Sequence, residues 1–258
     1  MSADNPIKAA GNGTPLSVWQ ASPVLGAVRL IAPLALVPAG SRLVVVAPHP
    51  DDEVLGCGGL LAGFAGREHD LLLISVTDGE GSHPGSAAWP GERLRQRRPL
   101  ESRAALLALG LNPDRVAWQR LRLADSAVHA DEGALAHALV HCLRPSDTVL
   151  TTWRLDGHCD HEAVGRACAQ ATATVGASLI EVPIWAWHWA QPDDPRLPWR
   201  RARKVALGPP QLARKHAAIA AHASQLDADG ERPPVLGEIT LQRLLQPFEL
   251  VFLEQVLP

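Results

Sequence analysis

RLVVVAPHPDDEVLGCGGLLAGFA, residues 42–65, is the stretch that decides the fold. Its first six residues, 42–47, form an apolar, β-branched run that is typical of a strand buried on both faces. Polar residues follow at 48–53, and a glycine cluster then precedes the apolar segment 60–65, which we expect to be helical. A buried strand, a polar turn and a helix in this order predict the start of a β–α–β unit.

The same alternation continues along the chain. We expect strands at 71–77, 116–123, 148–153, 178–189 and 248–254, and helices at 92–109 with a break at Pro99 and a C-terminal cap at Gly110, at 133–143, at 162–173 and at 211–223. This spacing predicts a Rossmann-like, three-layer α/β fold with a mostly parallel sheet. We predict one domain over residues 1–258, with an N-terminal extension at 1–40 and a small cap at 183–210.

The composition describes a globular protein. Of 258 residues, 47% are hydrophobic and 20% are charged, so a large core can be buried and global disorder is excluded. A formal net charge of −3 gives the surface no broad attraction for nucleic acid or for an anionic membrane. The four cysteines form no CxxC pair and no disulfide framework, so we expect reduced thiols in a cytoplasmic protein.

The most apolar stretch near the N-terminus, residues 16–40, is not expected to cross a membrane. Arg29 and three prolines interrupt it, whereas a spanning helix needs about 20 consecutive, mostly apolar residues. We expect this stretch to lie over the domain as a helix and a strand, or to contact a second copy of the chain in a homo-oligomer.

Two short segments rich in metal-binding side chains each follow a predicted strand. They are HPDDE at 49–53 and HCDH at 158–161. Ligands of an open α/β sheet bind beyond the carboxyl ends of its strands, so both segments are expected at that edge. Two imidazoles and one carboxylate, with positions left for water, suit a catalytic zinc site, and the same ligands suit non-haem Fe(II).

The adjacent carboxylates Asp51 and Asp52 indicate two different roles. Neighbouring side chains diverge, so one would bind the metal and the other would lie beside the metal-bound water. Such a water has a pKa of about 7, and a nearby carboxylate can accept its proton. The plainer interpretations are an Asp-rich turn that caps a helix and, for HCDH, a solvated helix start. Two such segments at strand ends favour a shared site.

The two segments resemble the PIG-L or LmbE-like family of metal-dependent N-deacetylases. VVVAPHPDDEVLGCGGLLA at 44–62 and DGHCDHEAVGRA at 156–167 carry the resemblance. Weaker family features recur as TDGEG at 77–81, an R-x-x-E followed by LG within 98–110, and KHAAIAAHASQ at 215–225. The resemblance implies an LmbE-like fold and a Zn²⁺ cofactor, with Fe²⁺ as an alternative in vivo. It also implies removal of the N-acetyl group from an N-acetylglucosamine-type sugar or glycoconjugate, a small-molecule partner.

Matching the motif positions gives the ligands and the base that the resemblance implies. His49, Asp52 and His161 correspond to the metal ligands. Asp51, beside a ligand, corresponds to the general base that activates the metal-bound water.

The remaining site residues are carried over in the same way. The resemblance implies that His158 stabilises the tetrahedral oxyanion and that Asp160 orients this imidazole and raises its basicity. Arg98 and Asp125 are expected to hydrogen-bond sugar hydroxyls. Some members have a tyrosine at the position of Asp156, and since this chain contains no tyrosine, any tyrosine-assisted step is unavailable.

Three other functions are compatible with the sequence. One is an amidase or deacylase for an N-acyl natural product or thiol conjugate. Another is an Fe(II) oxygenase, in which Asp51 would have no obvious role. A third is a non-catalytic sugar-binding protein, against which the intact catalytic residues argue. No serine lies in a G-x-S-x-G elbow, so a covalent route is disfavoured.

Several other residues are open to two interpretations. Trp185, Trp187 and Trp189 alternate, so in an extended segment they share one face, which covers the edge of the core or stacks on a sugar; we favour the core. Cys159 is expected to point away from the metal. The glycines at 56–59 do not have P-loop spacing and are better explained by close packing of a helix on a strand.

Overall fold

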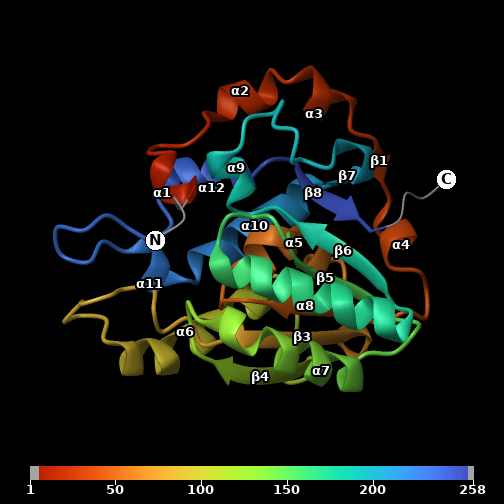
Figure 1. The fold of residues 1–258 in the computed structure, drawn as a ribbon, viewed down its shortest axis with the longest axis horizontal. Helices are drawn as coiled ribbons and strands as arrows, with labels where there is room; N and C mark the ends of the chain where they lie inside the picture. Colours follow the sequence, from red (N-terminus) through yellow and green to blue (C-terminus); the bar gives the residue numbers. More distant parts are fainter. Residues whose placement is uncertain (1–5, 255–258) are drawn as a thin grey trace.

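The apolar runs of the sequence form the strands of one eight-stranded sheet (Figure 1). The computed structural model describes residues 6–254. The strand order is β1-β7-β8-β6-β5-β2-β3-β4, and all neighbours are parallel except that β8 is antiparallel to β6 and β7. The strands are β1 (Leu30–Ile31), β2 (Leu43–Ala47), β3 (Leu71–Thr77), β4 (Ala117–Leu123), β5 (Thr148–Thr152), β6 (Ser178–Val182), β7 (Ala202–Ala206) and β8 (Phe248–Leu253). The predicted mostly parallel α/β sheet is confirmed.

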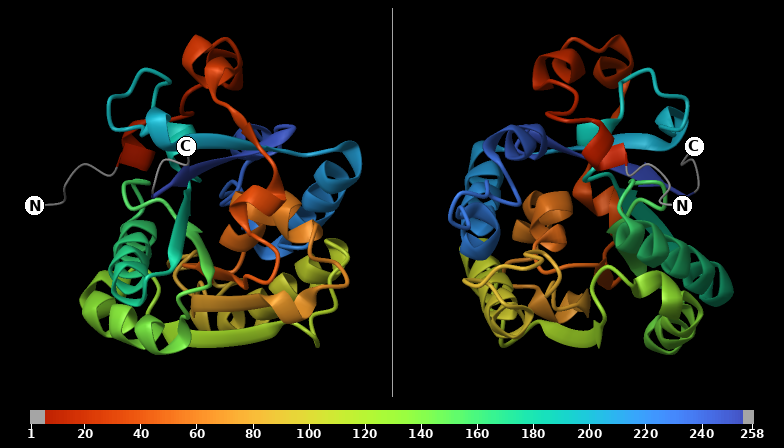
Figure 2. Two further views of the ribbon diagram at one scale, coloured as in Figure 1. Left: turned by 90° about the vertical axis from the view of Figure 1, so that its right-hand side faces the viewer. Right: turned by 60° about the vertical axis from the view of Figure 1, so that its left-hand side comes forward.

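Helices cover both faces of the sheet, which gives three layers (Figures 1 and 2). The α-helices are α1 (Pro6–Ala9), α2 (Leu16–Gln20), α3 (Pro23–Ala27), α4 (Pro33–Leu36), α5 (Asp52–Ala62), α6 (Gly91–Ala108), α7 (Glu132–Cys142), α8 (Cys159–Val175), α9 (Ala186–Trp189), α10 (Pro209–Ala220), α11 (Ala223–Leu226) and α12 (Glu238–Leu244). Short 3₁₀ turns are η1 (Glu68–Asp70), η2 (Val128–Asp131) and η3 (Trp199–Arg201). Alternate side chains of β2 enter different cores: Leu43 and Val45 pack with α5 and α6, whereas Val44 and Val46 pack with α7 and α8.

The glycines of α5 allow this helix to lie very close to the sheet and to the loop after β7. A Cβ atom on Gly59 would come within 2.4 Å of Leu207 Cδ2, and one on Gly56 within 2.7 Å of Val182 Cγ2. Close packing is therefore the reason for these glycines, as predicted. It also fixes the position of α5, which begins at Asp52 directly after the His49–Asp51 turn.

The N-terminal segment lies along the β7 side of the sheet (Figure 2). Trp19 is buried against Trp187, with ring centroids 4.8 Å apart. The buried Arg243 donates from Nε to the Thr14 carbonyl at 2.7 Å and from Nη2 to the Asn12 carbonyl at 2.5 Å. Thus part of residues 16–40 covers the domain as short helices and a strand. Within residues 6–254, no helix is long and apolar enough to cross a membrane.

The expected helix break at Pro99 is wrong. Helix α6 runs through Pro99 without interruption, although proline removes the hydrogen bond to the carbonyl four residues earlier. That carbonyl, of Arg95, receives a long 3.5 Å contact from Arg120 Nη2. A side chain from β4 thus partly compensates for the bond that the proline removes.

The expected strand at 178–189 is wrong in its second half. Strand β6 ends at Val182, and α9 begins at Ala186. The backbone N–H groups of residues 184–186 bond to the carboxylate of Asp156 rather than to a neighbouring strand. The tryptophans at 185, 187 and 189 therefore share no extended face.

Candidate metal centre

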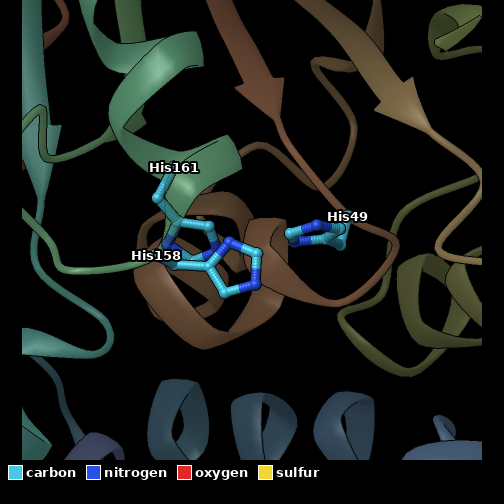
Figure 3. Close-up of side chains that lie close together, drawn as sticks. All are labelled: His49, His158 and His161. Carbon is cyan, nitrogen blue, oxygen red and sulfur yellow. The ribbon is translucent and has the colours of Figure 1, made fainter. Parts of the chain in front are cut away.

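The HPDDE and HCDH segments meet at the carboxyl ends of two adjacent parallel strands, β2 and β5. The chain passes from β2 to β3 and β4 on one side, whereas β5 and β6 lie on the other side of β2. Such a switch point opens a crevice at the sheet edge. His49 follows β2, while His158 and His161 lie at the start of α8 (Figure 3). Their ligand nitrogens all lie within 4.8 Å of one another.

The carboxylate of Asp52 lies between two of these imidazoles. Its Oδ2 is 3.1 Å from His49 Nδ1 and 3.3 Å from His161 Nε2. Ligand atoms about 2.0 Å from a tetrahedral zinc ion are about 3.3 Å from each other, so these distances fit a shared ion. His161 Nε2 is also buried and has no hydrogen-bond partner in the described part of the chain. The donor set and the unpartnered nitrogen both fit a divalent metal.

Each of these two imidazoles has a carboxylate behind its other nitrogen. His161 Nδ1 is 2.8 Å from Asp156 Oδ2, and His49 Nε2 is 3.2 Å from Asp160 Oδ2 and 3.3 Å from Asp125 Oδ1. Although burial lowers it, the surrounding carboxylates raise the pKa of His49 well above its usual value and that of His161 to about 9. Backing carboxylates of this kind orient histidine ligands and make them more basic. The arrangement favours a cation between the two rings.

Asp51 is held in an unusual backbone conformation directly before α5. Its φ is +140°, which costs about 1–3 kcal/mol in a non-glycine residue. The Glu53 carboxylate accepts the Asp51 N–H at 3.0 Å, and Arg98 Nη2 donates to Asp51 Oδ2 at 2.9 Å. Burial raises the pKa of Asp51 to about 7 even though Arg98 opposes the shift. A carboxylate with this pKa suits proton exchange near neutral pH.

His158 is a neutral imidazole at the N-cap of α8. Its Nδ1 accepts the backbone N–H of Asp160 at 3.3 Å, which places the ring proton on Nε2. Burial and the neighbouring rings of His161 and His49 lower the pKa of His158 to about 3. The ring can therefore donate a hydrogen bond from Nε2 without being charged.

Asp160 does not orient His158 with its carboxylate, contrary to the expectation from sequence. Its Oδ2 accepts the Ser126 N–H at 2.6 Å and lies beside His49, and its Oδ1 accepts the Val128 N–H at 3.2 Å. The side chain leaves the first turn of α8 toward residues 126–128, so only its backbone N–H reaches His158. The carboxylate instead backs His49.

Arg98 and Asp125 also have contacts that differ from the expected sugar contacts. Arg98 is buried, and its two terminal nitrogens donate to the Gly79 carbonyl at 2.8 Å, the Pro50 carbonyl at 2.7 Å and Asp51. Asp125 accepts the Gly81 N–H at 2.8 Å while it faces His49. Both side chains border the pocket, but their hydrogen bonds position other residues of the site.

A pocket of about 220 Å³ opens over this centre. Its lining includes apolar side chains, Leu55, Trp185, Val235 and Leu236, and polar ones, Ser82, Asp125, Ser126 and Gln225. Glu101, the acid of the R-x-x-E, accepts the N–H of Ser224 at 3.0 Å and its hydroxyl at 2.6 Å, and thereby holds the chain next to Gln225. Of these groups, sequence reasoning gave no role to Gln225 or to Asp156, although both lie within motifs that it singled out.

The fold and the centre together define an α/β protein with a candidate metal site of two histidines and one aspartate at the sheet edge. Residues 44–172 match the PIG-L family, described as GlcNAc-PI de-N-acetylase. This match covers half of the chain, and the protein belongs to the PIG-L family.

Curated relatives are similar over part of their length. The chain is 33% identical over 149 residues to 2'-N-acetylparomamine deacetylase of Streptomyces fradiae, covering 52% of this chain and 53% of that protein. It is 31% identical over 189 residues to 1D-myo-inositol 2-acetamido-2-deoxy-alpha-D-glucopyranoside deacetylase of Mycobacterium sp. (strain KMS), covering 63% of this chain and 59% of that protein. The chain thus spans little more than half the length of these two relatives.

A solved structure supports the fold. A deacetylase from the biosynthesis pathway of teicoplanin superposes with a TM-score of 0.62 at 21% identity, covering 83% of this chain and 97% of that one. At this identity the likeness concerns the fold alone.

Proposed function

We propose that this protein is a zinc-dependent hydrolase that removes the N-acetyl group from an N-acetylglucosamine-type sugar or glycoconjugate. The observation that carries the proposal is the convergence of His49, Asp52 and His161, with a second carboxylate, Asp51, directly beside them. This arrangement supplies ligands and a base that are separate from each other. Family membership and the names of the relatives support the same chemistry.

Three groups have separate roles in amide hydrolysis. A Zn²⁺ ion held by the three ligands would polarise the amide carbonyl and lower the pKa of water. Asp51 takes the proton from the attacking water and passes it to the leaving nitrogen, so that the C–N bond breaks to give acetate and a free amine. His158 Nε2–H donates to the carbonyl oxygen as its charge develops. Loss of one such donor typically lowers kcat by about 10²–10³.

The pocket lining contains the two kinds of group that bind sugars. Apolar side chains such as Trp185 can cover the C–H face of a ring, and Ser82 and Gln225 can bind hydroxyls. We propose a small N-acetylated sugar as the partner, and the cytoplasm as the compartment, since no described cysteine is in a disulfide.

The test is acetate release by the Zn²⁺-loaded protein from a panel of N-acetylglucosamine conjugates. Asp51→Asn should abolish turnover while zinc content, measured by elemental analysis, stays at the wild-type level. Asp147→Asn is the matched control, because Asp147 is equally buried but lies at the opposite end of β5.

Two results would redirect the proposal. Near wild-type turnover by Asp51→Asn removes Asp51 as the base. Hydrolysis of other N-acyl compounds but of no sugar conjugate favours the amidase alternative.

A further inference from the structure

The buried carboxylate of Asp156 binds two parts of the site at once. Asp156 lies in the turn between β5 and α8 and is fully buried. Its Oδ2 is 2.8 Å from His161 Nδ1 and accepts the Trp185 N–H at 3.0 Å. Its Oδ1 accepts the N–H groups of Ile184 at 3.0 Å and Ala186 at 2.9 Å. These four N–H groups use all the acceptor positions of one carboxylate.

The backbone beside Asp156 strengthens the same connection. The Asp156 carbonyl accepts Trp189 Nε1–H at 2.7 Å. A Cβ atom on the next residue, Gly157, would lie 2.6 Å from that Nε1, so glycine is required at this close approach. The turn after β5 and the segment from residue 184 to α9 are therefore joined through Asp156 on two sides.

The segment bound by Asp156 forms part of the pocket wall. Trp185 lines the pocket together with Leu55 and Leu236, whereas Trp187 is buried in the core. Asp156 thus holds the backbone of a wall residue and the ring of a metal ligand. From these contacts we propose that Asp156 is a positioning residue that couples the Trp185 wall of the substrate pocket to the metal ligand His161. The positioning of His161 stands on the geometry alone, whereas the role of Trp185 in substrate binding rests on the proposed function.

The carboxylate determines which nitrogen of His161 is free. Because the Asp156 carboxylate only accepts hydrogen bonds, Nδ1 of His161 keeps its proton, and Nε2, which faces Asp52, is the nitrogen that would give up its proton to bind a metal. The amide in Asp156→Asn has the same shape but can present an N–H to His161 Nδ1, which favours the opposite tautomer. Nε2, which would bind the metal, then carries a proton. An asparagine also cannot accept all three backbone N–H groups of residues 184–186 as well as His161.

The experiment measures zinc affinity and substrate kinetics separately. Zinc dissociation constants are obtained by competition with a chromophoric chelator, without substrate. We expect Asp156→Asn to bind Zn²⁺ about 10–100-fold more weakly, the usual effect of losing a carboxylate behind a histidine ligand. At saturating Zn²⁺ its KM should also rise. Trp185→Ala should raise KM and leave zinc affinity unchanged, and Asp147→Asn should change neither.

Two outcomes would overturn the proposal. One is zinc affinity of Asp156→Asn within twofold of Asp147→Asn. The other is a normal KM at saturating zinc, which would show that the wall is not coupled to the ligand. If the asparagine variant does not fold, Asp156→Glu keeps an acceptor for His161 but adds a methylene group in a fully buried position. It should bind zinc within a few-fold of wild type with a raised KM, and an unchanged KM overturns the coupling.

The proposed function can fail independently. If no N-acetylated sugar is hydrolysed, the zinc titrations still decide whether Asp156 positions His161.

Discussion

Replacement of Arg98 tests whether this side chain supports the base or contacts the substrate. The guanidinium is buried and donates to two backbone carbonyls at 2.7 and 2.8 Å and to Asp51 at 2.9 Å. Arg98→Gln leaves the carboxylate and at least one carbonyl without a partner in a buried place. Removal of one member of a buried ion pair costs about 3–5 kcal/mol, and we expect a loss of unfolding free energy in this range.

The matched control is Arg103→Gln on the same helix. Arg103 pairs with Asp114 at the surface, where its side chain is 42% exposed, and such a pair contributes about 0–1 kcal/mol. Urea denaturation of both variants measures the difference. Because Asp51 loses its anchor, kcat should fall more than KM rises in Arg98→Gln. A variant as stable as Arg103→Gln, with only a raised KM, would refute this reasoning and support a direct sugar contact.

Three further predictions concern the support of the site. Lys215→Met should lower the unfolding free energy, measured by urea denaturation, by about 3–5 kcal/mol. The reason is that the buried carboxylate of Glu249, 2.8 Å from Lys215 Nζ, loses its counter-ion; a change below 1 kcal/mol would contradict this. Burial lowers the pKa of His222 to about 3, so unfolding takes up a proton below pH 6.5 and stability falls as the pH decreases. Between pH 7 and pH 5, wild type should therefore lose about 2 kcal/mol more than His222→Leu, and equal losses would exclude the effect. Gly165→Ala would place a Cβ atom 2.8 Å from the Thr152 carbonyl, so α8 must shift, which should cost about 1–3 kcal/mol of unfolding free energy. Because α8 carries His161, zinc affinity should also weaken. Unchanged zinc affinity in chelator competition would show that α8 accommodates the methyl group without moving His161.

Strands β2, β3, β4, β5, β6 and β8 and the HPDDE and HCDH segments were accessible from the sequence because their signals are local, whereas β7, which lies within the expected cap at 183–210, was not predicted. A continuous apolar, β-branched run such as 43–47 predicts a strand buried on both faces, and strand ends determine where HPDDE and HCDH lie. The glycines at 56–59 lack phosphate-loop spacing, and this was the reason to predict that they allow close packing of the helix.

The partners of each polar side chain were not accessible, because they come from distant parts of the chain. Asp160 bonds to residues 126–128, and Arg98 bonds to Pro50 and Gly79. No local pattern specifies such pairs. Asp156 was noted only as the position where a tyrosine is absent, although its role depends on N–H groups 28 to 30 residues further on. The same carboxylate explains why α9 replaced the expected end of a strand.

The position of β8 has a consequence for how the chain folds during synthesis. β7 and β1 connect to the remaining strands only through β8, which lies between β7 and β6. Of the described strands, β8 is synthesised last, so the parallel block β6-β5-β2-β3-β4, which carries the HPDDE and HCDH segments, can assemble while the β1–β7 pair is still separate from it. A nascent protein halted before Phe248 should therefore already present the histidines to zinc, while β1 and β7 are not yet joined to the rest of the sheet.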